Sequence, residues 1–251
     1  MAHSYLPGKQ NYSLMKGELF AKAPSESVFR SVGEVPSFTW SPQVETIDHY
    51  SSRSGVRIRD AQIITEIGAE ISITTDESTI QNLAYALQGT ISGYTQTQAT
   101  GATVSLASVS AGEAIDIGLL DITGVSATAD AGATDLVNSV DYQVFAEGGA
   151  IRFLKDFTDV EVTYDAPEIT AADGRSFVEM LAQTGGVTVD LLFVGRNQQG
   201  RRYRVDSLRV DLRPSGSVGF ISDEIAQIEL TGTAVEIVGS STPWGRAMAL
   251  N

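Results

Sequence analysis

The chain has 251 residues, of which 42% are hydrophobic and 19% are charged, so it can bury a sizeable core in one large domain or two small ones. Its formal net charge of −14 argues against a protein that coats duplex nucleic acid or an anionic membrane surface, because both are bound through lysine and arginine. The absence of cysteine excludes disulfides, thiolate metal sites and cysteine nucleophiles.

No stretch approaches ~18 uninterrupted apolar residues, the length that a membrane-spanning helix requires. The N-terminus lacks the apolar segment of a signal peptide, so we expect synthesis in the cytoplasm without export by that route. Acidic residues concentrate in the middle of the chain, where 60–173 hold 18 acids and two bases, Arg152 and Lys155. This pattern indicates either a solvated acidic surface or a surface that repels an anionic partner.

Two long segments alternate between apolar and polar residues with the period of a β-strand. In the first, 36–48, Phe38, Trp40 and Val44 share one face, and the second, 62–74, carries isoleucine at most positions of one face. The residues between them have a Ser/Gly centre, which predicts the tip of a long hairpin at 48–60.

The sequence predicts one helix, at 80–87, where Ile80, Leu83, Ala84 and Leu87 form an apolar stripe. The T-x-x-E pattern of 74–77 resembles a capping box at its start, and Gly89 is placed to end it. Six further strand segments follow from residue 142 onward. They are 142–147, 150–154, 160–164, 187–194, 202–212 and 224–237.

The Ala/Ser/Gly-rich stretch 95–133 contains short apolar alternations, so we expect short strands and loops there rather than a linker. One helix among about a dozen strands indicates a mainly β protein, an antiparallel β-sandwich or barrel with one flanking α-helix. We expect a single domain over residues 1–251, with an N-terminal arm at 1–16, a hairpin loop at 48–60 and a C-terminal arm at 239–251.

The sequence offers little for catalysis or for binding a metal or cofactor. Of two histidines, His3 lies near the N-terminus and His49 follows Asp48, with Glu45 nearby; we interpret His49 as an exposed residue beside a loop. No phosphate-binding glycine motif occurs. We therefore expect no enzyme, catalytic residue, metal or cofactor.

The strongest basic cluster, Arg201, Arg202 and Arg204 around Tyr203, has three interpretations. The cluster could pair with acids on a neighbouring chain, bind a nucleic-acid strand or form a solvated face, and we favour the first interpretation.

Several segments, in order, resemble the major tail tube proteins of long, non-contractile-tailed bacteriophages. They spread over roughly residues 17 to 238, and 95–133 matches least. The segments are 33–42, 45–50, Asp60 with the isoleucine-rich strand after it, 75–78, 82–84, 141–144, 149–153, 200–205, 212–214 and 228–232.

The resemblance implies a β-sandwich with one flanking helix that forms hexameric rings stacked into a hollow tube, the path for DNA ejection into the host. It implies that strands of neighbouring subunits join into an inner barrel, and that the hairpin loop and termini contact the next ring. The partners are then the chain itself, other tail proteins at the tube ends, and DNA that passes without specific binding. The expected location is the virion.

The polar faces of the two long strands carry no lysine or arginine, which suits a channel for a polyanion. We expect Glu45, Glu66 and Glu70 to line the lumen, the alternative being outward solvent. Arg53, Arg57 and Arg59 at the hairpin tip are expected to meet acids of an adjacent ring, the alternative being a solvated loop.

Three other functions stay open. A tube protein of a contractile tail or secretion system has a related fold, and a long peripheral insertion argues against it. A β-sandwich adhesion or carbohydrate-binding module predicts a secretion signal and an aromatic patch, whereas an acidic β-fold hydrolase predicts clustered acids in a cleft.

Overall fold

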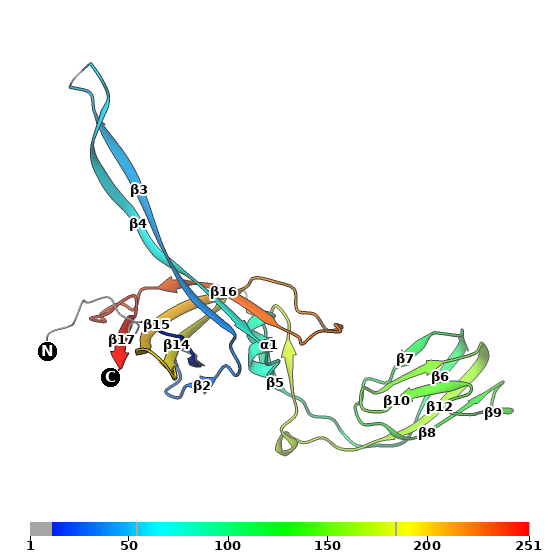
Figure 1. Ribbon diagram of the computed structural model, residues 1–251. Helices are drawn as coiled ribbons and strands as arrows, with labels where there is room; N and C mark the ends of the chain where they lie inside the picture. The colour runs from blue at the N-terminus through cyan, green and yellow to red at the C-terminus, as the bar shows by residue number, and fades with distance from the viewer. Residues whose placement is uncertain (1–11, 54, 184, 251) are drawn as a thin grey trace. The chain divides into compact units, whose positions relative to one another are not determined.

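The computed structural model describes residues 12–53, 55–183 and 185–250, and it divides into two compact units. Unit 2 is Ser92–Phe177, and unit 1 is formed by the described residues on either side of it (Figure 1). The expectation of one domain over 1–251 does not hold, because the chain leaves unit 1, builds a second core and returns. Strand signals alone do not reveal this division, because they do not say which strands share a core.

Unit 1 is built on an antiparallel sheet that has eight strands within the described residues. Its order is β2-β1-β14-β15-β16-β4-β3, and β17 also pairs with β15. The strands are β1 (Gly17–Lys22), β2 (Arg30–Ser31), β3 (Ser37–Ser51), β4 (Ile58–Thr75), β14 (Val187–Gly195), β15 (Arg202–Pro214), β16 (Ile228–Val235) and β17 (Arg246–Leu250). The mainly β, antiparallel fold with one flanking helix is confirmed.

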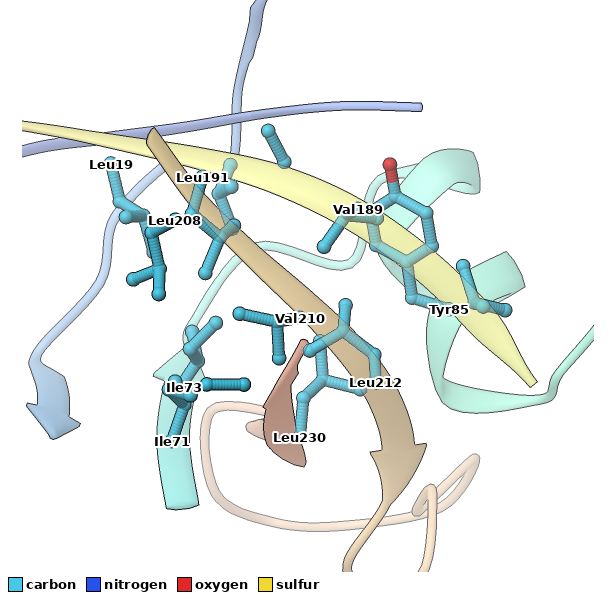
Figure 2. Packing of buried hydrophobic residues seen from close by; sticks show 14 of the residues in the cluster. Leu19, Ile71, Ile73, Tyr85, Val189, Leu191, Leu208, Val210, Leu212 and Leu230 are labelled. Atoms are coloured by element: carbon cyan, nitrogen blue, oxygen red, sulfur yellow. The ribbon is translucent and has the colours of Figure 1, made fainter. Parts of the chain in front are cut away.

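Alternate residues of five of these strands form the core of unit 1. Figure 2 shows Ile71 and Ile73 of β4 close to Val210 of β15 and Leu230 of β16, with Tyr85 of the helix at the same core. Ile71 and Val210 have no exposed surface, so they are removed completely from water. Burial of one such side chain stabilises a fold by about 1.5–3 kcal/mol, which makes this face the anchor of β4.

The predicted helix is confirmed as α1 (Ile80–Ala86), which packs against β15 and β16. Its cap differs from the prediction: Thr79 is the N-cap, and its side chain accepts a hydrogen bond from the Asn82 amide at 3.2 Å. Thr74 and Thr75 instead end β4, and Glu77 accepts a hydrogen bond from the Glu34 amide. Within the described part of the chain, no helix is long and apolar enough to cross a membrane.

The C-terminal segment, expected as an arm, is a strand of the sheet. β17 pairs with residues 202–206 of β15, whereas β16 pairs with residues 209–214 of the same edge. Ser207, between the two stretches, has a φ of 55°, the left-handed conformation typical of a β-bulge. Of the expected N-terminal arm 1–16, residues 1–11, His3 among them, lie outside the described residues, and the Lys16 carbonyl accepts a hydrogen bond from the Arg196 amide.

Unit 2 is a β-sandwich in which a four-stranded sheet, β6-β12-β8-β9, and a three-stranded sheet, β10-β11-β7, enclose one core. Phe153 and Val162 lie fully buried in that core. A short pair, β5 with β13, is the remaining sheet of the described chain. The strands are β5 (Thr90–Gly93), β6 (Ala99–Val109), β7 (Ala114–Asp116), β8 (Thr123–Ala129), β9 (Thr134–Leu136), β10 (Tyr142–Phe145), β11 (Ala150–Phe153), β12 (Phe157–Ala166) and β13 (Ser176–Glu179).

One turn of unit 2 requires glycine. Gly149 has a φ of 66°, and a Cβ atom there would lie 1.8 Å from the Leu119 carbonyl oxygen. We expect Gly149→Ala to lower the free energy of unfolding by about 2–5 kcal/mol, from backbone strain plus the close contact. The measurement is urea unfolding, with Gly148→Ala as control, because the nearest atom to a Cβ at that position is 3.9 Å away. Equal destabilisation by the two changes would contradict this account.

Candidate assembly surface

β3 and β4 continue well beyond the sheet as a two-stranded ribbon (Figure 1). β16 pairs with β4 from Glu70 to Thr75, and β3 is the last strand of the sheet. From Ile58 to Ala69, β4 therefore has β3 as its partner among the described strands. A two-stranded hairpin is marginally stable at best in water, so the ribbon is a candidate for contact with another molecule.

The ribbon exposes large apolar side chains. The side chain of Ile47 is 61% exposed, that of Ile63 56% and that of Ile67 58%. By contrast, Ile71, four residues after Ile67 in β4, is fully buried. The alternation of 36–48 and 62–74 is confirmed as strands, but their apolar faces meet the core of this chain only at Phe38 of β3 and from Ala69 onward in β4. Ala69, Ile71 and Ile73 face the core, and Val44, Ile63 and Ile67 do not.

Two bulges lie within the ribbon, between Glu45 and Thr46 and between His49 and Tyr50. Bulges bend a strand and increase its twist. The strands reach Ser51 and begin again at Ile58, so the loop at the tip is shorter than the predicted 48–60, and its residue 54 lies outside the described residues. Since β3 is the last strand of the sheet and β16 pairs with β4 only at 70–75, both edges of the ribbon offer backbone groups for pairing with another strand.

The three glutamates predicted to line a lumen lie on one face of the ribbon. Glu45 and Glu66 are direct cross-strand partners, and Glu70 accepts a hydrogen bond from Gln43 at 3.2 Å. With Gln43 they line a hollow of about 290 Å³ whose other side includes Arg213 of β15. Like charges directly opposite each other destabilise a strand pair, so the Glu45–Glu66 pair does not stabilise the ribbon.

The expected absence of lysine and arginine holds for β3 and β4 in this region, but not for the neighbouring strands. Arg213 forms no ion pair within the described part of the chain. Arg209 and Lys22 lie on the same face and both contact Asp190, at 2.8 and 2.9 Å. Partial burial raises the pKa of Asp190, but the hydrogen bonds from Arg209 and Lys22 outweigh it and hold that pKa below its usual range.

The arginines of the hairpin tip differ in their surroundings. Arg59 forms an ion pair with Asp48 of the same hairpin at 3.2 Å, and Arg57 lies over the ring of Tyr50, 4.9 Å from its centroid. The Arg53 amide donates to the Ser51 hydroxyl. Among the described residues, therefore, Arg53 and Arg57 keep a charge without an ionic partner, whereas Arg59 already has one.

The other candidates from the sequence are explained within this chain. His49 is exposed, and its Nδ1 lies 2.5 Å from Asp60, not beside Asp48. Arg204 of the basic cluster pairs with Asp206, whereas the Arg202 side chain donates to the Asn197 carbonyl, and neither Arg201 nor Arg202 forms an ion pair among the described residues. Over residues 12–53, 55–183 and 185–250, no group of acids and histidines is arranged to hold a metal ion.

An electrostatic clamp fixes the C-terminal strand. Asp206 is buried and accepts hydrogen bonds from Arg246 of β17 at 2.6 Å and from Arg204 at 2.8 Å. The Arg246 hydrogen bond, helped by Arg204 and opposed by burial, holds the pKa of Asp206 below its usual range. The sequence alone does not reveal this cluster, because Asp206 and Arg246 meet only through the pairing of β15 with β17.

The chain belongs to the family described as "Protein of unknown function UCP028589", whose model matches residues 12–236. Among curated proteins, a sequence search finds no match for the chain.

We expect Asp206→Asn to destabilise the protein in a pH-dependent way. A carboxyl group with a depressed pKa in the folded state stabilises the fold above its unfolded pKa of ~3.9, and this contribution is lost as the pH falls through the folded pKa. Urea unfolding should thus show the largest difference between wild type and Asp206→Asn near neutral pH, shrinking below about pH 4.

Asp223→Asn is the control, because Asp223 is exposed and lies outside this cluster. A difference between wild type and Asp206→Asn that stays constant over this pH range would exclude the clamp.

Proposed function

We propose that this protein is the structural subunit of the tail tube of a long, non-contractile-tailed bacteriophage. Its rings stack into a hollow conduit through which DNA leaves the virion, and the conduit performs no catalytic step. The partners are copies of the chain, the tail proteins at either end of the tube, and the passing DNA.

The observation that carries the proposal is the β3–β4 ribbon. It exposes isoleucines on a two-stranded element that has open edges and no core of its own. A monomer that works alone gains nothing from such an element, which risks aggregation. In an assembly of identical subunits, the same element finds a constant partner, and a closed ring removes the open edges.

Two further features support the same function. Most of the segments that resemble tail tube proteins lie in order along both strands of the ribbon, the helix, β15 and β16 of unit 1, and two of them, 141–144 and 149–153, lie in unit 2. Unit 2 is a long insertion in the chain, Ser92–Phe177, which argues against a tube enclosed by a contracting sheath.

Glu45, Glu66 and Glu70 are the residues that we propose for the lumen. They lie together on one exposed face, and carboxylates keep a polyanion mobile because they do not bind phosphate. Arg213 lies on the far side of the same hollow, so the proposed wall is acidic on balance rather than free of cations.

We expect the purified chain to form hollow rods with annular end views in negative-stain electron microscopy. Replacing residues 52–57 by Asn-Gly should keep a two-residue hairpin turn and the fold, but shorten or abolish the rods, because the tip is removed together with Arg53 and Arg57. Circular dichroism checks that the variant is folded. A wild-type chain that stays monomeric at every concentration would refute the proposed function.

The lumen assignment is tested by Glu66→Lys with Glu70→Lys. This change should leave tubes intact, and even stabilise the ribbon by about 0.2–1 kcal/mol, because Glu45 then faces a lysine. Genome release from virions that carry it should slow down, since the wall now attracts DNA. Glu66→Gln with Glu70→Gln is the control that removes charge without reversing it; release at the wild-type rate from the lysine variant would exclude these residues from the lumen.

A further inference from the structure

An apolar groove on the core side of the unit 1 sheet is left uncovered by the residues that the structure describes. Two adjoining hollows of about 370 and 550 Å³ share Phe38 and Trp40 of β3, Val205 of β15 and Ala247 of β17. Phe38 and Val205 also pack against the main core, so the groove continues that core to the surface. Its lining holds both tryptophans of the chain, Trp40 and Trp244, which are 41% and 36% exposed.

We propose that this groove receives the β3–β4 ribbon of a second copy of the chain. The proposal rests on the proposed function for the identity of the occupant, and adds where on the subunit the ribbon binds. The apolar side chains that would enter are Ile47 and Ile63, each more than half exposed, whereas Ile64 points to the opposite face of the ribbon. Ile47 and Ile63 are cross-strand partners, so they present one continuous apolar surface.

The ribbon of the same copy does not reach its own groove. Trp40 lines the groove, and β3 runs on from it as an extended strand. The seven residues from Trp40 to Ile47 span roughly 23 Å in that conformation. The exposed isoleucines therefore lie far from the groove of their own subunit, and the groove is available to another copy.

Charges at the two surfaces are complementary. Arg53 and Arg57 at the ribbon tip have no ion pair among the described residues. Beside the groove, Glu34 precedes the lining residue Val35, and its amide donates to the Glu77 carboxylate. Neither Glu34 nor Glu77 has a cationic partner in the described part of the chain. Such rim charges contribute little affinity, but they set the orientation of the docked ribbon.

The contact is heterologous, because ribbon and groove are different surfaces of one subunit. Each bound copy presents a free groove or a free ribbon to the next, so association continues until it closes or is capped. This geometry gives a test with two variants. Ala247→Glu places a charge in the groove, and Ile47→Thr with Ile63→Thr removes the apolar surface of the ribbon but keeps its β-branched residues.

Each variant alone should associate at least about tenfold more weakly than wild type, as expected when a central apolar contact is lost. An equimolar mixture should form a discrete complex that contains both chains and does not elongate, because one intact ribbon meets one intact groove. Sedimentation and capture through a tag on one chain measure this complex. Tryptophan emission should shift to the blue on mixing, since both tryptophans line the groove that is filled.

Ala249→Glu and Gln62→Thr are the matched controls. They lie on the same strands as the test positions but outside the groove lining and the apolar surface, and should associate as wild type does. If Ala247→Glu fails to fold by circular dichroism, Trp244→Ala replaces it, because this residue of the turn before β17 lines the groove and is part exposed.

Two failures are distinguishable. Two results would exclude the groove as the binding site of the ribbon without affecting the proposed tube function. One is that Ala247→Glu forms rods as wild type does, and the other is that the mixture forms no complex although wild type polymerises. A wild-type chain that never associates would instead remove the tube function.

Discussion

A two-stranded ribbon with exposed isoleucines and open edges is the feature on which the proposed biology depends. In water such a ribbon has no neighbouring strand beyond its own pair and no core of its own. Here it is held at one end only, where Ile71 and Ile73 of β4 enter the core of unit 1 and β16 pairs with residues 70–75. The fold thus supplies a firm base for an element whose remaining length pairs with no further strand of the described chain.

The base of the ribbon and the uncovered groove belong to the same sheet. β15 joins them, because its residues 209–214 pair with β16 and its residues 202–206 pair with β17, across the bulge at Ser207. The ion pairs of Asp206 with Arg204 and Arg246 hold β17 in place. The ribbon and the groove of one subunit are therefore linked through a few hydrogen-bonded strands, as the proposed stacking of subunits would require.

The sequence predicted where the strands and the helix lie better than it predicted which of their faces are buried. Period-2 alternation identified both ribbon strands and the hairpin between them, and the stripe of 80–87 identified the helix. Alternation reports that a face is apolar, not what covers it, so Ile67 and Ile71 look alike in sequence although one is exposed and the other buried. Arg213 and the groove were missed for a related reason: the residues that meet there come from β3, β15 and β17, far apart in the chain.

The glutamates of the ribbon can be related to the risk that its open edges pair with other strands. Glu45 and Glu66 face each other across the strand pair, which weakens the hairpin by an amount on the order of 0.2–1 kcal/mol. Charged residues on exposed strands are also how proteins keep free edges from pairing indiscriminately. The same carboxylates that would leave DNA unbound in a bore therefore disfavour face-to-face stacking of two ribbons, which would bring four of them together. The contact that remains favourable is the one in which Ile47 and Ile63, further along the ribbon than the glutamates, are buried by a different part of the next subunit.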